Sequence, residues 1–213
     1  MIIDERFTDF INSYNGVQKE LLEAVRKEAV SENVPIIRRE MESYIKVMLG
    51  IVKPKRILEI GTAVGYSALL MAEYMPKDCT IVTMENYDVR IKKARENFAL
   101  AGKENVITLM EGDACEILPT LTGEFDFVFM DAAKGQYLNY LNYVKNLMAG
   151  GAILITDNIL CDGDIIESKY AVTRRNRTIH ARMRDYLYEI THSDEFDTTL
   201  IPLGDGISLS VRK

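Results

Sequence analysis

The chain has 213 residues, of which 47% are hydrophobic, and a mean hydropathy of −0.06, values typical of a globular protein of one ordinary to large domain. No run approaches the roughly 18 apolar residues of a membrane span, and the first ten residues lack the apolar stretch of a secretory signal, so we expect a cytoplasmic protein with no membrane partner. The formal net charge of −6 argues against a protein that coats nucleic acid through its overall charge, but it leaves room for a local basic patch.

The spacing of apolar residues predicts helices first, and then alternating strands and helices. Residues 17–31 and 37–52 carry apolar side chains at helical spacing, so the N-terminal quarter is expected to be helical. The later runs expected to form strands are 56–60, 80–84, 106–110, 125–130 and 152–156, with a closing hairpin of 198–202 and 207–211 across Gly204-Asp205-Gly206. This order predicts an α/β fold whose parallel sheet is covered by helices on both faces and binds its ligand at the carboxyl ends of the strands.

A glycine-bearing turn between the first strand and its helix, within residues 58–67, is a candidate ligand site. Glycine lets the backbone approach a ligand closely, and the helix that follows offers free N–H groups, although a tight connection alone would also explain the turn. Ala63 replaces the middle glycine of a GxGxxG motif, which disfavours a dinucleotide. Glu85 ends the second strand, where an acid can accept hydrogen bonds from ribose hydroxyls, and the pair favours an adenosine-containing ligand. Asp113, after the third strand, could border the adenine or could cap a helix.

Oxygen-bearing side chains follow two further strands of the predicted sheet. Asp131 comes directly after the fourth strand, and Asp157 and Asn158 follow the fifth. Carboxylate and amide oxygens suit Mg²⁺, Ca²⁺ or Mn²⁺, and strand ends at the centre of such a sheet would deliver them to one crevice; the alternative is that they are separate loop residues. Lys134, one turn after Asp131, is either a proton acceptor beside the bound cation or an exposed lysine.

At these residues the sequence resembles the cation-dependent O-methyltransferases, typified by catechol and caffeoyl-coenzyme A O-methyltransferases. The resemblance covers residues 34–36, 58–67, 131–137 and 156–158. It implies a Rossmann-like class I methyltransferase domain over residues 1–213, with a seven-stranded, mostly parallel sheet, a C-terminal antiparallel hairpin and a helical N-terminal cap over 1–52. It also implies a homodimer.

The resemblance further implies the cofactors and the residues that bind them. S-adenosylmethionine would be bound by Glu59, Gly61, Ser67, Glu85, Asp113 and Asp131. Mg²⁺ or another divalent cation would be held by Asp131, Asp157 and Asn158, with Lys134 and Asp131 as catalytic residues.

Residues 168–185 form a basic insertion in this acidic chain, with six basic residues against one acid. The arginines are Arg174, Arg175, Arg177, Arg182 and Arg184, and such a concentration suits phosphate contacts. A helix is expected from Thr178, with Ile179, Met183, Leu187 and Ile190 as its apolar stripe. The alternative is that the insertion is a solvated basic helix or a dimer contact.

This insertion resembles the bacterial tRNA 5-hydroxyuridine methyltransferase branch of the family, through Ser168, residues 170–172 and residues 175–184. Members make 5-methoxyuridine at the wobble position, so the resemblance implies the tRNA anticodon loop as partner. The adjacent 5-hydroxyl and 4-carbonyl oxygens could chelate a metal as a catechol does, and an unpaired loop base can enter a pocket. The alternatives are a small-molecule catechol or caffeoyl-type methyltransferase, an NAD-dependent oxidoreductase and a non-catalytic RNA-binding protein.

Overall fold

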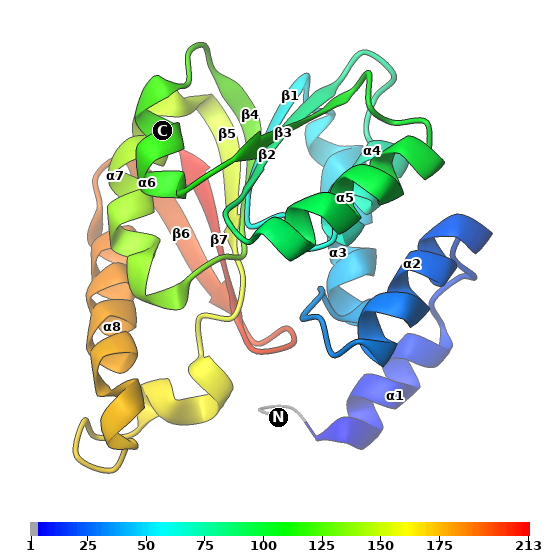
Figure 1. The fold of residues 1–213 in the computed structure, drawn as a ribbon. Coiled ribbons are helices and arrows are strands. Elements are labelled where there is room, and N and C mark those ends of the chain that lie inside the picture. The colour runs from blue at the N-terminus through cyan, green and yellow to red at the C-terminus, as the bar shows by residue number, and fades with distance from the viewer. Residues whose placement is uncertain (1–3) are drawn as a thin grey trace.

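The computed structural model describes residues 4–213, which form a seven-stranded sheet in the order β3-β2-β1-β4-β5-β7-β6 (Figure 1). The strands are β1 (Arg56–Ile60), β2 (Thr80–Glu85), β3 (Ile107–Glu111), β4 (Phe125–Met130), β5 (Met148–Thr156), β6 (Phe196–Ile201) and β7 (Ile207–Arg212). The first five strands pair in parallel, whereas β7 runs antiparallel to both β5 and β6. The predicted fold class, with its C-terminal hairpin, is confirmed.

Helices cover both faces of this sheet (Figure 1). They are α1 (Glu5–Ser13), α2 (Glu20–Ser31), α3 (Arg39–Val52), α4 (Tyr66–Tyr74), α5 (Asp88–Leu100), α6 (Ala114–Ile117), α7 (Tyr137–Leu147) and α8 (Arg177–His192). Short 3₁₀ turns complete the chain: η1 (Leu118–Thr120), η2 (Lys134–Gln136), η3 (Cys161–Ile166) and η4 (Arg174–Asn176). Among the described residues, no helix has both the length and the apolar character that crossing a bilayer requires.

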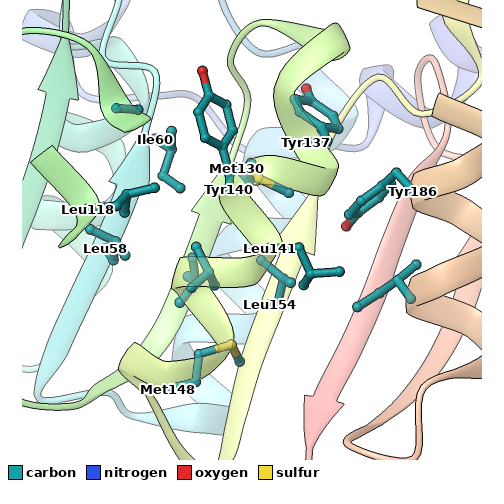
Figure 2. Packing of buried hydrophobic residues seen from close by; sticks show 14 of the residues in the cluster. Leu58, Ile60, Leu118, Met130, Tyr137, Tyr140, Leu141, Met148, Leu154 and Tyr186 are labelled. Carbon is teal, nitrogen blue, oxygen red and sulfur yellow. The ribbon is translucent and has the colours of Figure 1, made fainter. Parts of the chain in front are cut away.

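Two apolar clusters, one on each face, hold the helices to the sheet. Alternate residues of β1 divide between them, with Leu58 and Ile60 in the cluster under α6, α7 and α8, and Ile57 in the cluster under α2 to α5. Figure 2 shows the first cluster, where Tyr137 of α7 and Tyr186 of α8 meet above the sheet. Because the central strands are buried on both faces, their sequences are mostly apolar, with Glu59 of β1 as a buried exception.

The N-terminal helices agree with the expected helical segment over 1–52, and one prediction about α8 needs correction. Residues 5–13 form α1, whose bounds the sequence did not give and which buries none of its residues. In α8 the buried face consists of His180, Met183, Tyr186 and Ile190, whereas Ile179 is 36% exposed. One ring nitrogen of His180, Nε2, pairs with the carbonyl oxygen of Glu167 at 3.1 Å, whereas Nδ1 is buried with no partner among the described residues.

Candidate functional site

Two adjoining cavities lie at the carboxyl ends of the parallel strands. The larger cavity, about 520 Å³, is lined by the turn after β1, the end of β2 and the loop after β4. The smaller cavity, about 260 Å³, contains Asp157 and the hairpin turn between β6 and β7. Asp131, Asn158 and residues 35–37 line both cavities, so the segment between α2 and α3 forms a wall common to the two.

The turn after β1 brings the backbone of β1 against that of β4. Gly61 has a φ of +102°, and a Cβ atom there would lie 2.1 Å from the carbonyl oxygen of Asp131. Only glycine permits so close an approach. Ala63, in place of the second glycine, adopts a left-handed φ of +46°, and its N–H donates to Glu85 Oε2 at 2.8 Å. The turn therefore fixes both the edge of the larger cavity and the strand-end acid beside it.

Glu85 lies in the larger cavity, as its predicted role requires. Its Oε1 accepts hydrogen bonds from the backbone N–H groups of Asn86 at 3.0 Å and Tyr87 at 3.1 Å, so three backbone donors, with that of Ala63, orient the carboxylate. Gly61, Ser67 and Asp131 also line this cavity.

Glu59 and Asp113 are the two predicted cofactor residues that do not line the larger cavity. Glu59 is wholly buried, where it accepts a hydrogen bond from the Thr83 hydroxyl, and burial raises its pKa to about 7. Asp113 is an exposed N-cap whose carboxylate accepts from the N–H of Cys115 at 2.7 Å, while its neighbours Gly112 and Ala114 line the cavity. Asp113 therefore caps helix α6, which is one of the two roles that the sequence left open.

Asp131, Asp157 and Asn158 converge in the smaller cavity. The Asn158 amide donates to Asp131 Oδ1 at 2.8 Å, and the Asn158 backbone N–H donates to Asp157 Oδ1 at 2.7 Å. Burial raises the pKa of both carboxyl groups, and the charge of Asp131 raises that of Asp157 further. Two buried carboxylates in mutual repulsion require a positive charge or a proton nearby.

This donor set fits a hard divalent cation. Within residues 4–213, no donor bonds to the second oxygen of either carboxylate, and the Asn158 amide oxygen accepts no hydrogen bond. The set consists of two carboxylates and an amide; no group of three or more His, Cys, Asp or Glu side chains suited to a metal occurs in the described chain. Oxygen ligands from one or two carboxylates, with positions left for water and substrate, are typical of Mg²⁺ sites.

Lys134, which begins η2, lines the larger cavity and pairs with an acid that the sequence did not single out. Its Nζ donates to Asp205 Oδ2 at 3.1 Å, and the other oxygen of Asp205 accepts from the backbone N–H of Asp162 at 2.7 Å. Asp205 is 4% exposed, whereas the Lys134 side chain is 30% exposed. The hairpin turn thus holds an accessible ammonium group at the edge of the site.

The basic insertion adjoins this site. The Arg182 guanidinium donates to the carbonyl oxygen of Gly135, the residue after Lys134, at 3.2 Å. Figure 1 places the start of α8 at the same end of the sheet as the exit from β5. Arg177 and Arg184 also bond only to backbone carbonyls, and Arg174 and Arg175 are exposed. None of these five arginines forms an ion pair with a carboxylate of the described chain.

Comparison with known proteins agrees with this geometry. A family model described as O-methyltransferase matches residues 11–213. A catechol O-methyltransferase from Niastella koreensis is 28% identical over 171 residues, 78% of this chain and 77% of that protein. Caffeoyl-CoA O-methyltransferase 1 of Eucalyptus globulus is 30% identical over 193 residues, 84% of this chain and 76% of its own. The SAH-bound structure of a Podospora anserina methyltransferase superposes with a TM-score of 0.89 at 26% identity, covering 98% of this chain and 94% of that one.

Proposed function

The chain belongs to the O-methyltransferase family, and we propose that it transfers a methyl group from S-adenosylmethionine to the 5-hydroxyl of 5-hydroxyuridine at the wobble position of tRNA. The basic insertion, residues 168–185, is the observation that supports this choice of substrate. Its five arginines have no carboxylate partner in the described chain, and Arg182 bonds to the loop that carries Lys134. Phosphate groups are the partners that such guanidinium groups would take.

The larger cavity would bind the methyl donor. Glu85 would accept hydrogen bonds from the ribose hydroxyls, since three backbone N–H groups already hold its carboxylate in place. Gly61 leaves the backbone open at the turn, and Gly112 with Ala114 offers a small-residue surface for the adenine. The SAH bound to the Podospora anserina relative supports a ligand of this class.

The smaller cavity would hold the reacting hydroxyl and a divalent cation. Asp131, Asp157 and Asn158 would hold the cation, whose charge favours the ionised form of a hydroxyl group. Lys134 would first lose its ammonium proton to solvent and would then accept the hydroxyl proton at Nζ, with Asp205 fixing the position of that nitrogen. The wall of residues 35–37 would exclude water from both cavities.

An anticodon loop suits both parts of the site. Its wobble base is unpaired and can leave the stack to enter a pocket, while the backbone phosphates remain outside near the arginines. In 5-hydroxyuracil the 5-hydroxyl and the 4-carbonyl are adjacent, so they offer the same pair of oxygens as a catechol.

The second candidate is a small-molecule catechol or caffeoyl-type methyltransferase. The names of the curated relatives favour it, because they are catechol and caffeoyl-CoA enzymes. Every residue of the two cavities would serve this reaction equally well. The basic insertion favours tRNA over a free catechol, whereas a catechol attached to coenzyme A would also bring phosphates to the arginines.

We also propose that the chain forms a homodimer and that its N-terminal segment, residues 1–52, caps the substrate cavity. Residues 35–37 line both cavities, which supports a capping role for this part of the chain. Phe7 and Phe10 of helix α1, and Tyr14 at its C-cap, are more than half exposed, and a second copy of the chain would cover them.

Methyl transfer from labelled S-adenosylmethionine in the presence of Mg²⁺ tests the proposed function. The acceptors are tRNA bearing 5-hydroxyuridine, the same tRNA with plain uridine, and a simple catechol, each with and without chelator. We expect label on the hydroxylated tRNA alone, and its loss with chelator. Label chiefly on the catechol would establish the second candidate instead.

A further inference from the structure

One buried tyrosine hydroxyl connects the two loops that carry the proposed metal ligands. Tyr137, the first residue of α7, is 1% exposed. Its hydroxyl donates to the carbonyl oxygen of Asp157 at 3.1 Å and also approaches the carbonyl oxygen of Ala132 at 3.4 Å. Ala132 follows Asp131 in one loop, and Asp157 precedes Asn158 in the other. A single side chain thus links the backbones of both loops.

These two carbonyl groups depend on Tyr137. No other donor from residues 4–213 bonds to either of them. Loss of the hydroxyl would remove this donor and loosen the hold of α7 on both loops, while the bond from the Asp157 N–H to the Met130 carbonyl oxygen would remain. Asn158 has a left-handed φ of +60°, which asparagine adopts more readily than most residues, and its side chain and backbone N–H bond to the carboxylates of Asp131 and Asp157.

We infer that Tyr137 is a positioning residue that fixes Asp131 relative to Asp157 and Asn158 and thereby sets the affinity for the divalent cation. The inference rests on the proposed function, since it requires a cation at these residues. Groups that hold metal ligands in place, without touching the metal, typically change metal affinity by 10–100-fold when they are removed.

Tyr186 provides a matched control. Its ring is fully buried and packs edge-on against that of Tyr137, with centroids 5.6 Å apart (Figure 2). Its hydroxyl pairs with the hydroxyls of Thr156 at 2.6 Å and Ser208 at 3.4 Å, and with neither loop carbonyl. Tyr186→Phe therefore removes the same atom as Tyr137→Phe from an equally buried ring of the same cluster.

The test measures Mn²⁺ binding by electron paramagnetic resonance, S-adenosylmethionine binding by calorimetry without metal, and Tm for the wild type and both variants. We expect Tyr137→Phe to raise the Kd for Mn²⁺ roughly 10-fold, with donor binding unchanged, and raised Mg²⁺ to restore methyl transfer. Tyr186→Phe should lower Tm while binding Mn²⁺ as the wild type does. If Tyr137→Phe is itself less stable, the increase in Tm on adding a fixed Mn²⁺ concentration should still be smaller than for the wild type.

The outcomes separate the inference from the proposed function. An unchanged Mn²⁺ affinity in Tyr137→Phe, or an equal loss in Tyr186→Phe, would overturn the positioning role while the wild type still binds the cation. A wild-type protein that binds no Mn²⁺ would overturn the metal site and the positioning role together.

Discussion

The arginines of η4 give the sharpest test of where an RNA would lie. Arg174 and Arg175 are exposed, and neither guanidinium forms an ion pair in the described chain, so replacing both by Ala should change stability by no more than about 0.5 kcal/mol. If each contacts one phosphate of a single-stranded loop, the slope of log affinity against log salt should fall by about 1.4. By the same relation, affinity at 0.1 M salt should fall by up to roughly 25-fold.

Fluorescence anisotropy of a labelled anticodon stem-loop, titrated at several salt concentrations, measures both quantities. The matched control replaces Lys27 and Lys77, two exposed lysines on other parts of the surface, by Ala, which changes the net charge equally. The control should keep the wild-type slope. The reasoning fails if the arginine pair keeps that slope too, or if both double variants lose it to the same extent, because η4 would then have no phosphate contact of its own.

Three further predictions concern the cavities. Asp157→Ala should abolish metal-dependent methyl transfer while calorimetry shows unchanged S-adenosylmethionine binding, and undiminished turnover would remove the metal from the mechanism. Gly61→Ala should lower the free energy of unfolding by about 2–4 kcal/mol in denaturant titration, because its Cβ would lie 2.1 Å from a carbonyl oxygen; Gly50→Ala, in open space on α3, should not destabilise. Burial raises the pKa of Asp131 and Asp157 above the ordinary 3.8, so the folded state holds these protons more tightly than the unfolded state. Without metal, stability should therefore decline as pH rises above 3.8 through the raised values, and a saturating divalent cation should reduce that decline; an identical decline with and without cation would contradict this.

Two central strands, β1 and β4, could be predicted to the residue because burial on both faces leaves a mostly apolar run. β1 and β4 begin and end where the sequence placed them. β5 begins at Met148 rather than 152, since the pair Gly150-Gly151 interrupts the apolar run and the register shifts between Phe125 and Phe127 on the neighbouring strand. A strand start that depends on an irregular pairing has no local signal.

The candidate site could be predicted only where strand order determines it. Asp131 and Asp157 lie together because β4 and β5 are parallel neighbours whose ends meet at one edge of the sheet. Asp205 reaches the same edge from a hairpin turn near the end of the chain, where an aspartate between two glycines indicates a turn and nothing more. Its pairing with Lys134 is a tertiary contact that no spacing in the sequence encodes.

The distribution of charge around the cavities bears on the class of substrate. The chain has more acidic than basic residues, and arginines elsewhere, such as Arg26 and Arg39, pair with carboxylates. The basic insertion has no such partners, so its positive field is not cancelled locally, whereas the smaller cavity presents the carboxylates of Asp131 and Asp157. A substrate matched to both regions carries its negative charge outside the cavity and a neutral group with two adjacent oxygens inside it. A nucleotide within an RNA loop has this arrangement, and so does a catechol attached to coenzyme A, whose phosphates would lie outside the cavity. A free catechol has no anionic group for the arginines, so the arrangement favours an anionic substrate over a free catechol.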